Sequence, residues 1–207
     1  SLISIKLACA NANRDAGFLP ELEHLYISQA CTEILGWKDY RKAFLVHILQ
    51  GGGGTSSNMN ANEVIANRAK SLASEAGQPD LQINSIDHVN LNQSTNDVYP
   101  SASNMAISIV TKQLIDSVDA LASAYHDLRE KFGEAPRLAR TCLQDAVGTT
   151  FDELFGSYEL VLLRNLRHLE HTGSELRELS LGGGIVGQPD ATPAEYRAAL
   201  LPHLHSA

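Results

Sequence analysis

Apolar residues recur mostly at steps of three and four along two stretches in the second half of the chain, from Pro100 to about Lys131 and from Phe151 to Leu179. This spacing places the apolar side chains on one face of an α-helix. The first stripe contains Ala102, Ala106, Ile109, Leu114, Val118, Leu121, Tyr125, Leu128 and Phe132; the second contains Phe155, Tyr158, Leu162, Leu166, Leu169, Leu176 and Leu179. Both predicted helices are longer than the roughly 8–20 residues of an ordinary globular helix, which is typical of a helix bundle.

Three shorter helices are predicted before the long ones, at Leu2–Ala16, Pro20–Leu35 and Met59–Ala76. Gly17 and Gly36 stand where glycine C-terminal caps belong. The chain offers no sufficient partner for the two long stripes, so we expect the long helices to pack against other copies of the chain. The predicted fold class is therefore all-α, with short N-terminal helices leading into the long helices of an oligomeric bundle.

We expect two domains. Residues 1–98 would form an N-terminal helical domain, incomplete at its start, because the chain opens without Met inside a helical pattern. Residues 99–207 would form the first part of a central helix-bundle domain, which is truncated.

Charge and cysteine content argue against several classes of partner and site. The chain has 16 Lys and Arg residues against 24 Asp and Glu residues, a formal net charge of −8. Nucleic acid is therefore a poor partner, since phosphate contacts need clustered basic side chains. No apolar run approaches the roughly 20 residues of a membrane span, so no membrane contact is expected. Cys9, Cys31 and Cys142 match no zinc or redox spacing, which favours reduced thiols in a cytoplasmic protein.

A glycine run, residues 51–54, leads into the polar cluster Thr55, Ser56, Ser57 and Asn58. Free backbone N–H groups and the helix dipole at such a helix start can hold an anion. An ordinary N-terminal cap after a flexible turn explains the same composition.

A second polar cluster, Ser94, Thr95, Asn96 and Asp97, precedes the helix predicted from Pro100. Capping needs only one of these side chains. Neutral donors in this number suit a carboxylate ligand.

The polar clusters lie in segments that resemble a known family. GGGGTSSNMNANEVIANR (51–68) is similar to the GxGTSxNMNxNEVIANRA stretch of aspartases and class II fumarases, and DHVNLNQSTNDVYPS (87–101) to their NDHVNxSQSxNDxxP stretch. RTCLQDAV (140–147) resembles GRTxxQDAxP, and LGGGIVG (181–187) resembles LGGTAVG. The order agrees and the resemblance covers essentially the whole chain. Within the family, three features look more like aspartases: Thr95, the stretch NMNANEVIANRA and Leu143. Fumarases tend to have Ser at the position of Thr95 and Thr at the position of Leu143.

The resemblance implies a lyase that converts L-aspartate to fumarate and ammonia through an aci-carboxylate intermediate, without a cofactor or metal. Such an intermediate needs fixed hydrogen-bond donors where its charge grows. The implied substrate-binding residues are Thr55, Ser94, Thr95, Asn96 and Thr141. They would meet at the ends of the central bundle of a homotetramer, and the partner would be a small dicarboxylate or amino-acid substrate.

Two departures from the family pattern change the expectation for this chain. The family's GSSxMPxKxNP loop, whose second Ser is the base and whose Lys binds a carboxylate, has no counterpart among the 207 residues. No catalytic base is therefore expected here, and the chain alone should be inactive. Cys142 replaces a His or Gln, and we expect a buried, inert thiol there.

Three alternatives remain open: a class II fumarase, a related amino-dicarboxylate lyase, and a truncated, non-enzymatic lyase-like protein that oligomerises or binds a carboxylate. The length of the parent reading frame would distinguish the two enzyme alternatives from the non-enzymatic protein.

His168 and His171, with Glu175 one turn on, could offer metal ligands, but a solvated helix face explains them better.

Overall fold

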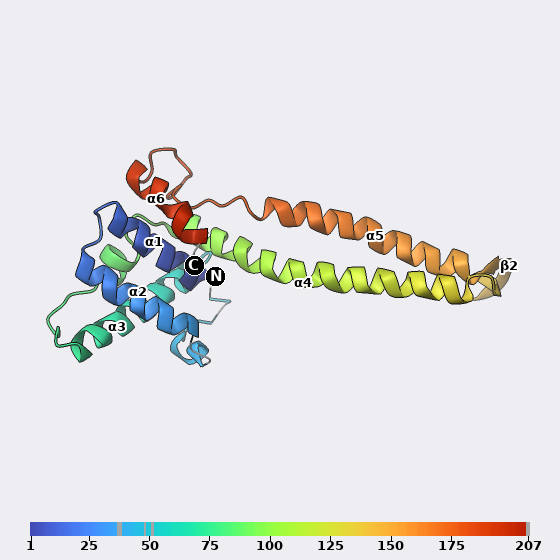
Figure 1. The fold of residues 1–207 in the computed structure, drawn as a ribbon, viewed down its shortest axis with the longest axis horizontal. Helices are drawn as coiled ribbons and strands as arrows, with labels where there is room; N and C mark the ends of the chain where they lie inside the picture. The colour runs from blue at the N-terminus through green and yellow to red at the C-terminus, as the bar shows by residue number, and fades with distance from the viewer. Residues whose placement is uncertain (37–38, 48, 51, 206–207) are drawn as a thin grey trace. The chain divides into compact units, whose positions relative to one another are not determined.

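The computed structural model describes residues 1–36, 39–47, 49–50 and 52–205. Helices dominate it, which confirms the all-α fold class (Figure 1). In chain order the elements are α1 (Leu2–Asp15), α2 (Glu21–Gly36), the 3-10 helix η1 (Tyr40–Ala43), α3 (Thr55–Glu75), the π-helix η2 (Ser85–Val89), α4 (Thr95–Phe132), β1 (Pro136–Thr141), β2 (Gln144–Thr150), α5 (Phe151–Glu175) and α6 (Ala194–His205). Among the described helices, none is long and apolar enough to cross a membrane.

The chain divides into two compact units. Unit 1 comprises Ser1–Met105 and Leu179–Ala207, and unit 2 comprises Ala106–Glu178. The helix α4 therefore begins in unit 1 and continues into unit 2. The domain boundary expected between residues 98 and 99 stays a prediction.

Unit 1 is held together by two apolar clusters between short helices. In the first, α2 packs against α1 and α3, and Ile27 and Ile65 are fully buried. In the second, α6 packs against α1, with Ile5 and Tyr196 at its centre. Fully burying an aliphatic side chain of this size stabilises a fold by about 1.5–3 kcal/mol. Both clusters include residues of α1, and they hold this helix, which carries the fully buried Lys6, in place.

The helix α4 begins at Thr95, five residues before the start expected at Pro100. Two reciprocal bonds form its cap: the Asn96 N–H donates to Ser94 Oγ over 3.1 Å, and the Ser94 N–H donates to Asp97 Oδ1 over 3.0 Å. Because both partners lie upstream of Pro100, the helix starts before the proline. Pro100 then sits inside the helix.

The helix α3 also starts earlier than expected, at Thr55 instead of Met59. Its N-cap is Gly54, whose φ of 92° lies in the left-handed region that favours glycine. Gly17 has a φ of 77° directly after the C-cap of α1, as predicted. Gly36 is the last residue of α2 itself, and it does not have a positive φ.

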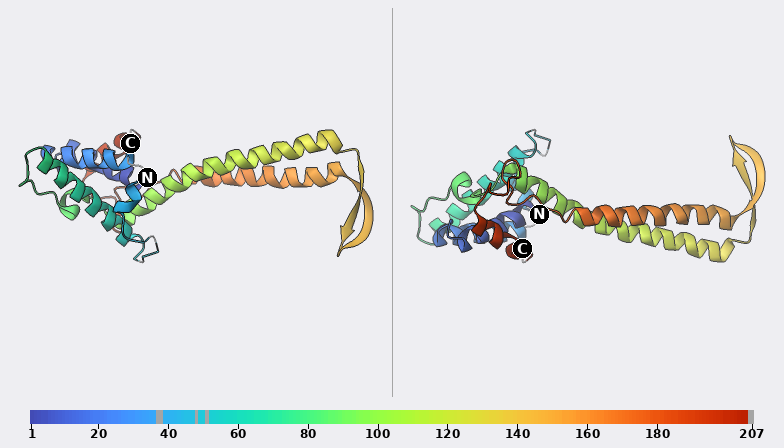
Figure 2. Two further views of the ribbon diagram at one scale, coloured as in Figure 1. Left: turned by 90° about the horizontal axis from the view of Figure 1, so that it is seen from below. Right: turned by 90° about the horizontal axis from the view of Figure 1, so that it is seen from above.

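In unit 2, α5 runs antiparallel beside α4 (Figure 2). Arg129 of α4 donates to Asp152 over 3.0 Å and to Glu159 over 2.7 Å, and the ring centroids of Tyr125 and Tyr158 are 5.3 Å apart. No described residue of α5 is buried. The apolar stripe of α5 therefore has too little cover within this chain.

A two-stranded antiparallel hairpin, β1 with β2, joins the two long helices. This hairpin was not predicted from the sequence. Its turn is formed by Cys142 and Leu143, with φ values of 47° and 64°. Two consecutive left-handed residues give the turn that matches the twist of paired strands, but Asn-Gly or Asp-Gly usually supplies it. A Cys-Leu pair carries no such signal.

Candidate functional site

The start of α4 carries three of the predicted donors, Ser94, Thr95 and Asn96. The N–H groups of a first helical turn have no partner within the helix, and the helix dipole makes that end positive. Asp97 is 1% exposed and accepts N–H bonds from Ser94 and from Gly184, the second over 3.0 Å. Burial raises the pKa of the Asp97 carboxyl, while these backbone bonds oppose the rise. Asp97 thus fixes the turn that presents the donors.

The glycine-rich segment 181–187 lies against this helix start. Besides the Gly184 bond, the Asn96 side-chain amide donates to the Ile185 carbonyl over 2.8 Å, and the Ser180 N–H donates to Ser101 Oγ over 3.1 Å. A cavity of about 500 Å³ opens at the same place. It is lined by Asn92, Gln93, Ser94, Gly184, Ile185, Val186, Gln188, Ala191 and Thr192. Two segments that resemble family motifs therefore meet around one cavity.

The two donor segments are joined directly. The Asn58 side-chain amide, in the first turn of α3, donates to Thr95 Oγ over 3.0 Å. Thr95 is partly buried, and no acceptor for its own proton is found among the described residues. A hydroxyl that accepts one bond in this way keeps its O–H for a ligand.

Asn90 forms the centre of the polar network beneath Thr95. Its Oδ1 accepts from Asn58 over 3.3 Å, from Asn62 over 3.0 Å and from the Lys6 ammonium over 2.9 Å. The Oδ1 atoms of Asn58 and Asn62 are buried and have no partner among the described residues. The three donors therefore converge on one oxygen.

Lys6 is fully buried, and its ammonium also donates to Gln93 Oε1 over 2.9 Å. No carboxylate lies within ion-pair distance of Lys6 in the described part of the chain. Desolvation by burial lowers the pKa of the Lys6 ammonium from 10.5 to about 8, partly opposed by Cys9, Asp97 and Cys31. Burying a cation that only neutral amides hold costs folding free energy. The Lys6 ammonium places a positive charge close to the start of α4.

Lys6, Asn90 and Gln93 were not predicted from the sequence to take part in the site. One signal for Lys6 was present: it is the single charged residue before Arg14, and the other residues from Leu2 to Asn13 are apolar or small apart from two asparagines. Its partners lie 84 and 87 positions away, and no local pattern predicts that separation.

The remaining predicted donors stand apart from this network. Thr55 is the first residue of α3 and is exposed, and Asn58 follows it in the same turn. Thr141 is the last residue of β1 and belongs to unit 2, so its approach to the donors of unit 1 stays a prediction. Cys142 was expected to be buried, which is wrong: it is exposed, because it occupies the hairpin turn. Cys9 and Cys31 are buried, and burial raises the pKa of their thiols to about 11 and about 12.

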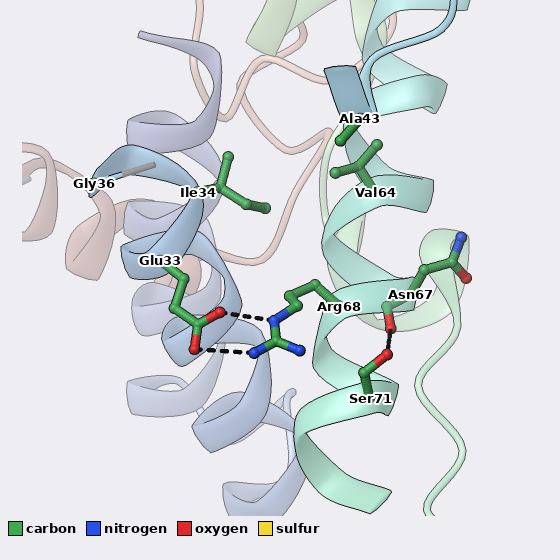
Figure 3. Close-up of a pocket in the computed structure, with 8 residues that line it drawn as sticks. All are labelled: Glu33, Ile34, Gly36, Ala43, Val64, Asn67, Arg68 and Ser71. Atoms are coloured by element: carbon green, nitrogen blue, oxygen red, sulfur yellow. Dashed lines mark hydrogen bonds and ion pairs between the residues drawn. The ribbon is translucent and has the colours of Figure 1, made fainter. Parts of the chain in front are cut away.

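A second cavity, of about 700 Å³, lies in unit 1 between α2 and α3 (Figure 3). Ile34, Ala43 and Val64 form its apolar part, and Arg68 crosses it to pair with Glu33 over 2.7 Å. None of the predicted donors lines it. Its Arg68–Glu33 pair is partly exposed and mutually satisfied, so the cavity adds nothing to the carboxylate-binding chemistry.

Comparison with known proteins places these motifs in one family. Residues 1–207 match the profile of a family described as Lyase. The aspartate ammonia-lyase of Pseudomonas canavaninivorans is 37% identical over 205 residues, which are 98% of this chain and 43% of that enzyme. The aspartate ammonia-lyase of Escherichia coli K12 is 33% identical over 195 residues, 94% of this chain and 41% of that enzyme.

Two solved structures share the fold. The class II fumarase of Schistosoma mansoni superposes with a TM-score of 0.88 at 28% identity, over 99% of this chain and 43% of that one. A fumarate lyase:delta crystallin of Brucella melitensis gives a TM-score of 0.82 at 36% identity, over 99% of this chain and 45% of that one. The chain thus spans less than half the length of the relatives it matches.

Proposed function

Because this chain belongs to the aspartase/fumarase superfamily of lyases, we propose that it supplies part of the substrate site of an aspartate ammonia-lyase, as the amino-terminal part of a longer polypeptide. The reaction would convert L-aspartate to fumarate and ammonia. The enzyme would be a cytoplasmic homotetramer that needs neither a cofactor nor a metal.

One observation carries the proposal: Asn58 donates to Thr95 Oγ, which leaves the Thr95 O–H as a donor at the start of α4. When a base removes the proton next to a carboxylate, that carboxylate becomes an aci-carboxylate with an additional negative charge. Fixed donors that meet this growing charge lower the barrier more than they strengthen binding of the substrate. A neutral hydroxyl suits the task, since it needs no pKa adjustment.

Each predicted residue has a role in this scheme. Thr95 would donate its hydroxyl proton to the substrate carboxylate that becomes the aci-carboxylate. Ser94 and Asn96 would contribute the neighbouring donors of the α4 start, and the bond from Asn96 to Ile185 would open or be shared when substrate binds. Thr55 would add a donor from the first turn of α3, which Asn58 joins to Thr95 within this chain. Thr141, at the end of β1, would approach from another subunit of the tetramer.

The proton-abstracting base is proposed to lie outside these 207 residues, in a loop that the rest of the polypeptide supplies. A Lys of the same loop would bind the second carboxylate. The donors of this chain would then stabilise charge, and the loop would move the proton. Neither fragment would be active without the other.

A class II fumarase is the second candidate, because the fold superposes on such an enzyme with a TM-score of 0.88. Thr95 and Leu143 favour the ammonia-lyase, since the resemblance associates fumarases with Ser and Thr at these positions. A non-enzymatic, truncated lyase-like protein would keep the fold and the donors but lack the loop.

The polypeptide that includes this chain and the remainder of its reading frame tests the proposal. Its rates of fumarate formation from L-aspartate and from L-malate, with ammonia measured in parallel, distinguish the candidates. Ammonia release from L-aspartate at least tenfold faster than malate dehydration is the expected result. Preference for malate would make the protein a fumarase, and a natural chain without the loop and without either activity would leave only the non-enzymatic role.

A further inference from the structure

A side-chain amide can face a partner with its oxygen or with its NH2, and only the partner decides which. A hydroxyl has the same ambiguity, since it both donates and accepts. The network beneath Thr95 consists almost entirely of such groups: Asn90, Asn58, Asn62 and Thr95. Their directions therefore have to be set by a group that is not ambiguous.

Two groups around Asn90 are not ambiguous. The Gln93 backbone carbonyl only accepts, and the Asn90 NH2 donates to it over 3.1 Å. The Lys6 ammonium only donates, because it has three donors and no acceptor. Its 2.9 Å contact with Asn90 is possible only if Asn90 presents Oδ1. That oxygen, in turn, can be approached only by the NH2 groups of Asn58 and Asn62, at 3.3 and 3.0 Å. The arrangement persists although it leaves the Oδ1 atoms of both asparagines without a partner in the described structure.

The last link is the hydroxyl. Since Asn58 must turn its NH2 toward Asn90, the same NH2 faces Thr95 Oγ at 3.0 Å and donates to it. The reverse orientation of Asn58 would accept the Thr95 proton and remove the donor from the site.

We infer that Lys6 is a positioning residue that, together with the Gln93 backbone carbonyl, sets the direction of the hydrogen bonds from Asn90 through Asn58 to Thr95, and thereby presents the Thr95 hydroxyl as a donor. Lys6 does not contact Thr95; its contact with the cavity lining is the bond to Gln93. Its link to catalysis rests on the proposed function, whereas its effect on the network does not.

The network is tested on the 207-residue chain itself, by NMR of the side-chain amide groups of Asn58, Asn62 and Asn90. Lys6→Met removes the ammonium, and Lys70→Met, on the exposed face of α3, is the control. We expect exchange of the Asn58 and Asn62 amide protons with water to become roughly tenfold faster or more in Lys6→Met, as loss of a charge-assisted hydrogen bond implies. Exchange in Lys70→Met should equal that of the unaltered chain. Equal exchange in Lys6→Met with unchanged helicity would overturn the inference.

If Lys6→Met does not fold, a pH titration of the unaltered chain gives the answer. The charged and titratable groups that face Lys6 are Cys9 on α1, Cys31 on α2, Asp97 on α4 and, through Cys9, Tyr196 on α6. Burial raises the pKa of Cys9 to about 11 and of Cys31 to about 12, and it also raises the pKa values of Tyr196 and Asp97, the last opposed by backbone hydrogen bonds. Lys6, with a pKa of about 8, loses its charge between pH 7 and pH 9. The Asn58 and Asn90 amide signals should therefore shift together with a midpoint near pH 8. Signals that do not move across this range would overturn the inference.

The link to catalysis is tested in the longer polypeptide with a double-mutant cycle. Lys6→Met should lower kcat roughly 10–100-fold with little change in KM, as for a weakened transition-state donor. In a Thr95→Val background the same substitution should have almost no further effect on kcat, because the donor that Lys6 positions is gone. Additive losses would mean that Lys6 acts independently of Thr95 and would overturn the inference. A longer polypeptide without lyase activity would refute the proposed function and leave the amide measurements valid.

Discussion

The Asn58 side-chain amide and the Thr95 hydroxyl are 37 positions apart in the chain and form a hydrogen bond of 3.0 Å. The bond connects the first turn of α3 with the first turn of α4. Both turns expose N–H groups that lack a partner within their helix, so two positive helix ends converge on one site. Lys6, buried behind this bond, is the one Lys or Arg side chain that is closed to water among the described residues of unit 1.

The stability of the chain should depend on the charge of Lys6. Between its folded pKa of about 8 and its unfolded value of 10.5, the unfolded chain binds more protons at Lys6 than the folded chain does. The Lys6 contribution to the free energy of unfolding is therefore unfavourable below pH 8 and is relieved as pH rises. We expect the difference in unfolding free energy, unaltered chain minus Lys6→Met, to increase by about 1 kcal/mol from pH 8 to pH 9.

The comparison with Lys6→Met is essential, because Cys9 and Cys31 act in the opposite direction. Burial keeps both thiols protonated in the folded chain, with pKa values of about 11 and about 12, while unfolded thiols begin to ionise near pH 9. Their effect cancels in the difference between the two proteins. Urea unfolding at both pH values measures it. A difference that stays constant with pH would show that Lys6 is not buried as a cation.

Gly54→Ala should destabilise unit 1. Gly54 has a φ of 92°, which is strained for any residue with a Cβ, and a Cβ there would overlap the Tyr99 ring. We expect a loss of about 2–4 kcal/mol in the free energy of unfolding, from backbone strain and displacement of the ring. Gly36→Ala is the matched control: it is helical, has no neighbour within 4 Å of the new Cβ, and should be neutral or slightly stabilising. Equal stability of the two variants in urea unfolding would refute the assigned cap.

The two long helices should drive self-association. Several of their large apolar side chains are about half exposed or more, among them Ile109, Val110, Leu160 and Val161. Leaving such side chains in water forgoes about 1.5–3 kcal/mol each. Sedimentation of the 207-residue chain at micromolar concentration should show oligomers, and Val110→Glu with Leu160→Glu should shift it toward monomer. A well-folded monomer without any substitution would contradict this.

The 207-residue chain alone should form no fumarate from L-aspartate. The expected base and the carboxylate-binding Lys are not among its residues, and hydrogen-bond donors cannot remove a carbon-bound proton. Ultraviolet absorbance of fumarate, followed with the purified chain against a blank without protein, is sufficient. Any steady production that scales with the chain's concentration would show that a base is present in it.

Helix content was predictable because it follows local periodicity. The apolar stripes predicted α4 and α5, and Gly17 and Gly36 marked the ends of the predicted helices that correspond to α1 and α2. The starts of α3 and α4 were placed four and five residues too late, since Asp97 and Gly54 act as caps through geometry that a residue list does not contain. The hairpin was missed because its turn uses left-handed Cys142 and Leu143 in place of glycine or asparagine.

The hydrogen-bond donors of the candidate site could be predicted from the sequence, but the buried network that orients them could not. Ser94, Thr95 and Asn96 stand in a motif at a helix start, which is a local pattern. The network that orients Thr95 depends on Lys6, which meets Asn90 from 84 positions away once α1 is packed. Such a contact arises from tertiary structure alone. The exposure of Cys142 could not be predicted for the same reason, because burial of a turn residue depends on what packs against the turn.

The central claim is that the Thr95 hydroxyl donates to the aci-carboxylate, and Thr95→Val in the longer polypeptide tests it most directly. The substitution keeps the volume and removes the donor. We predict that kcat for ammonia release from L-aspartate falls about 10²–10³-fold while KM changes little, as for loss of one oxyanion donor. A role in capping alone would instead cost roughly 1 kcal/mol of stability. Normal kcat with a lowered melting temperature would contradict the account.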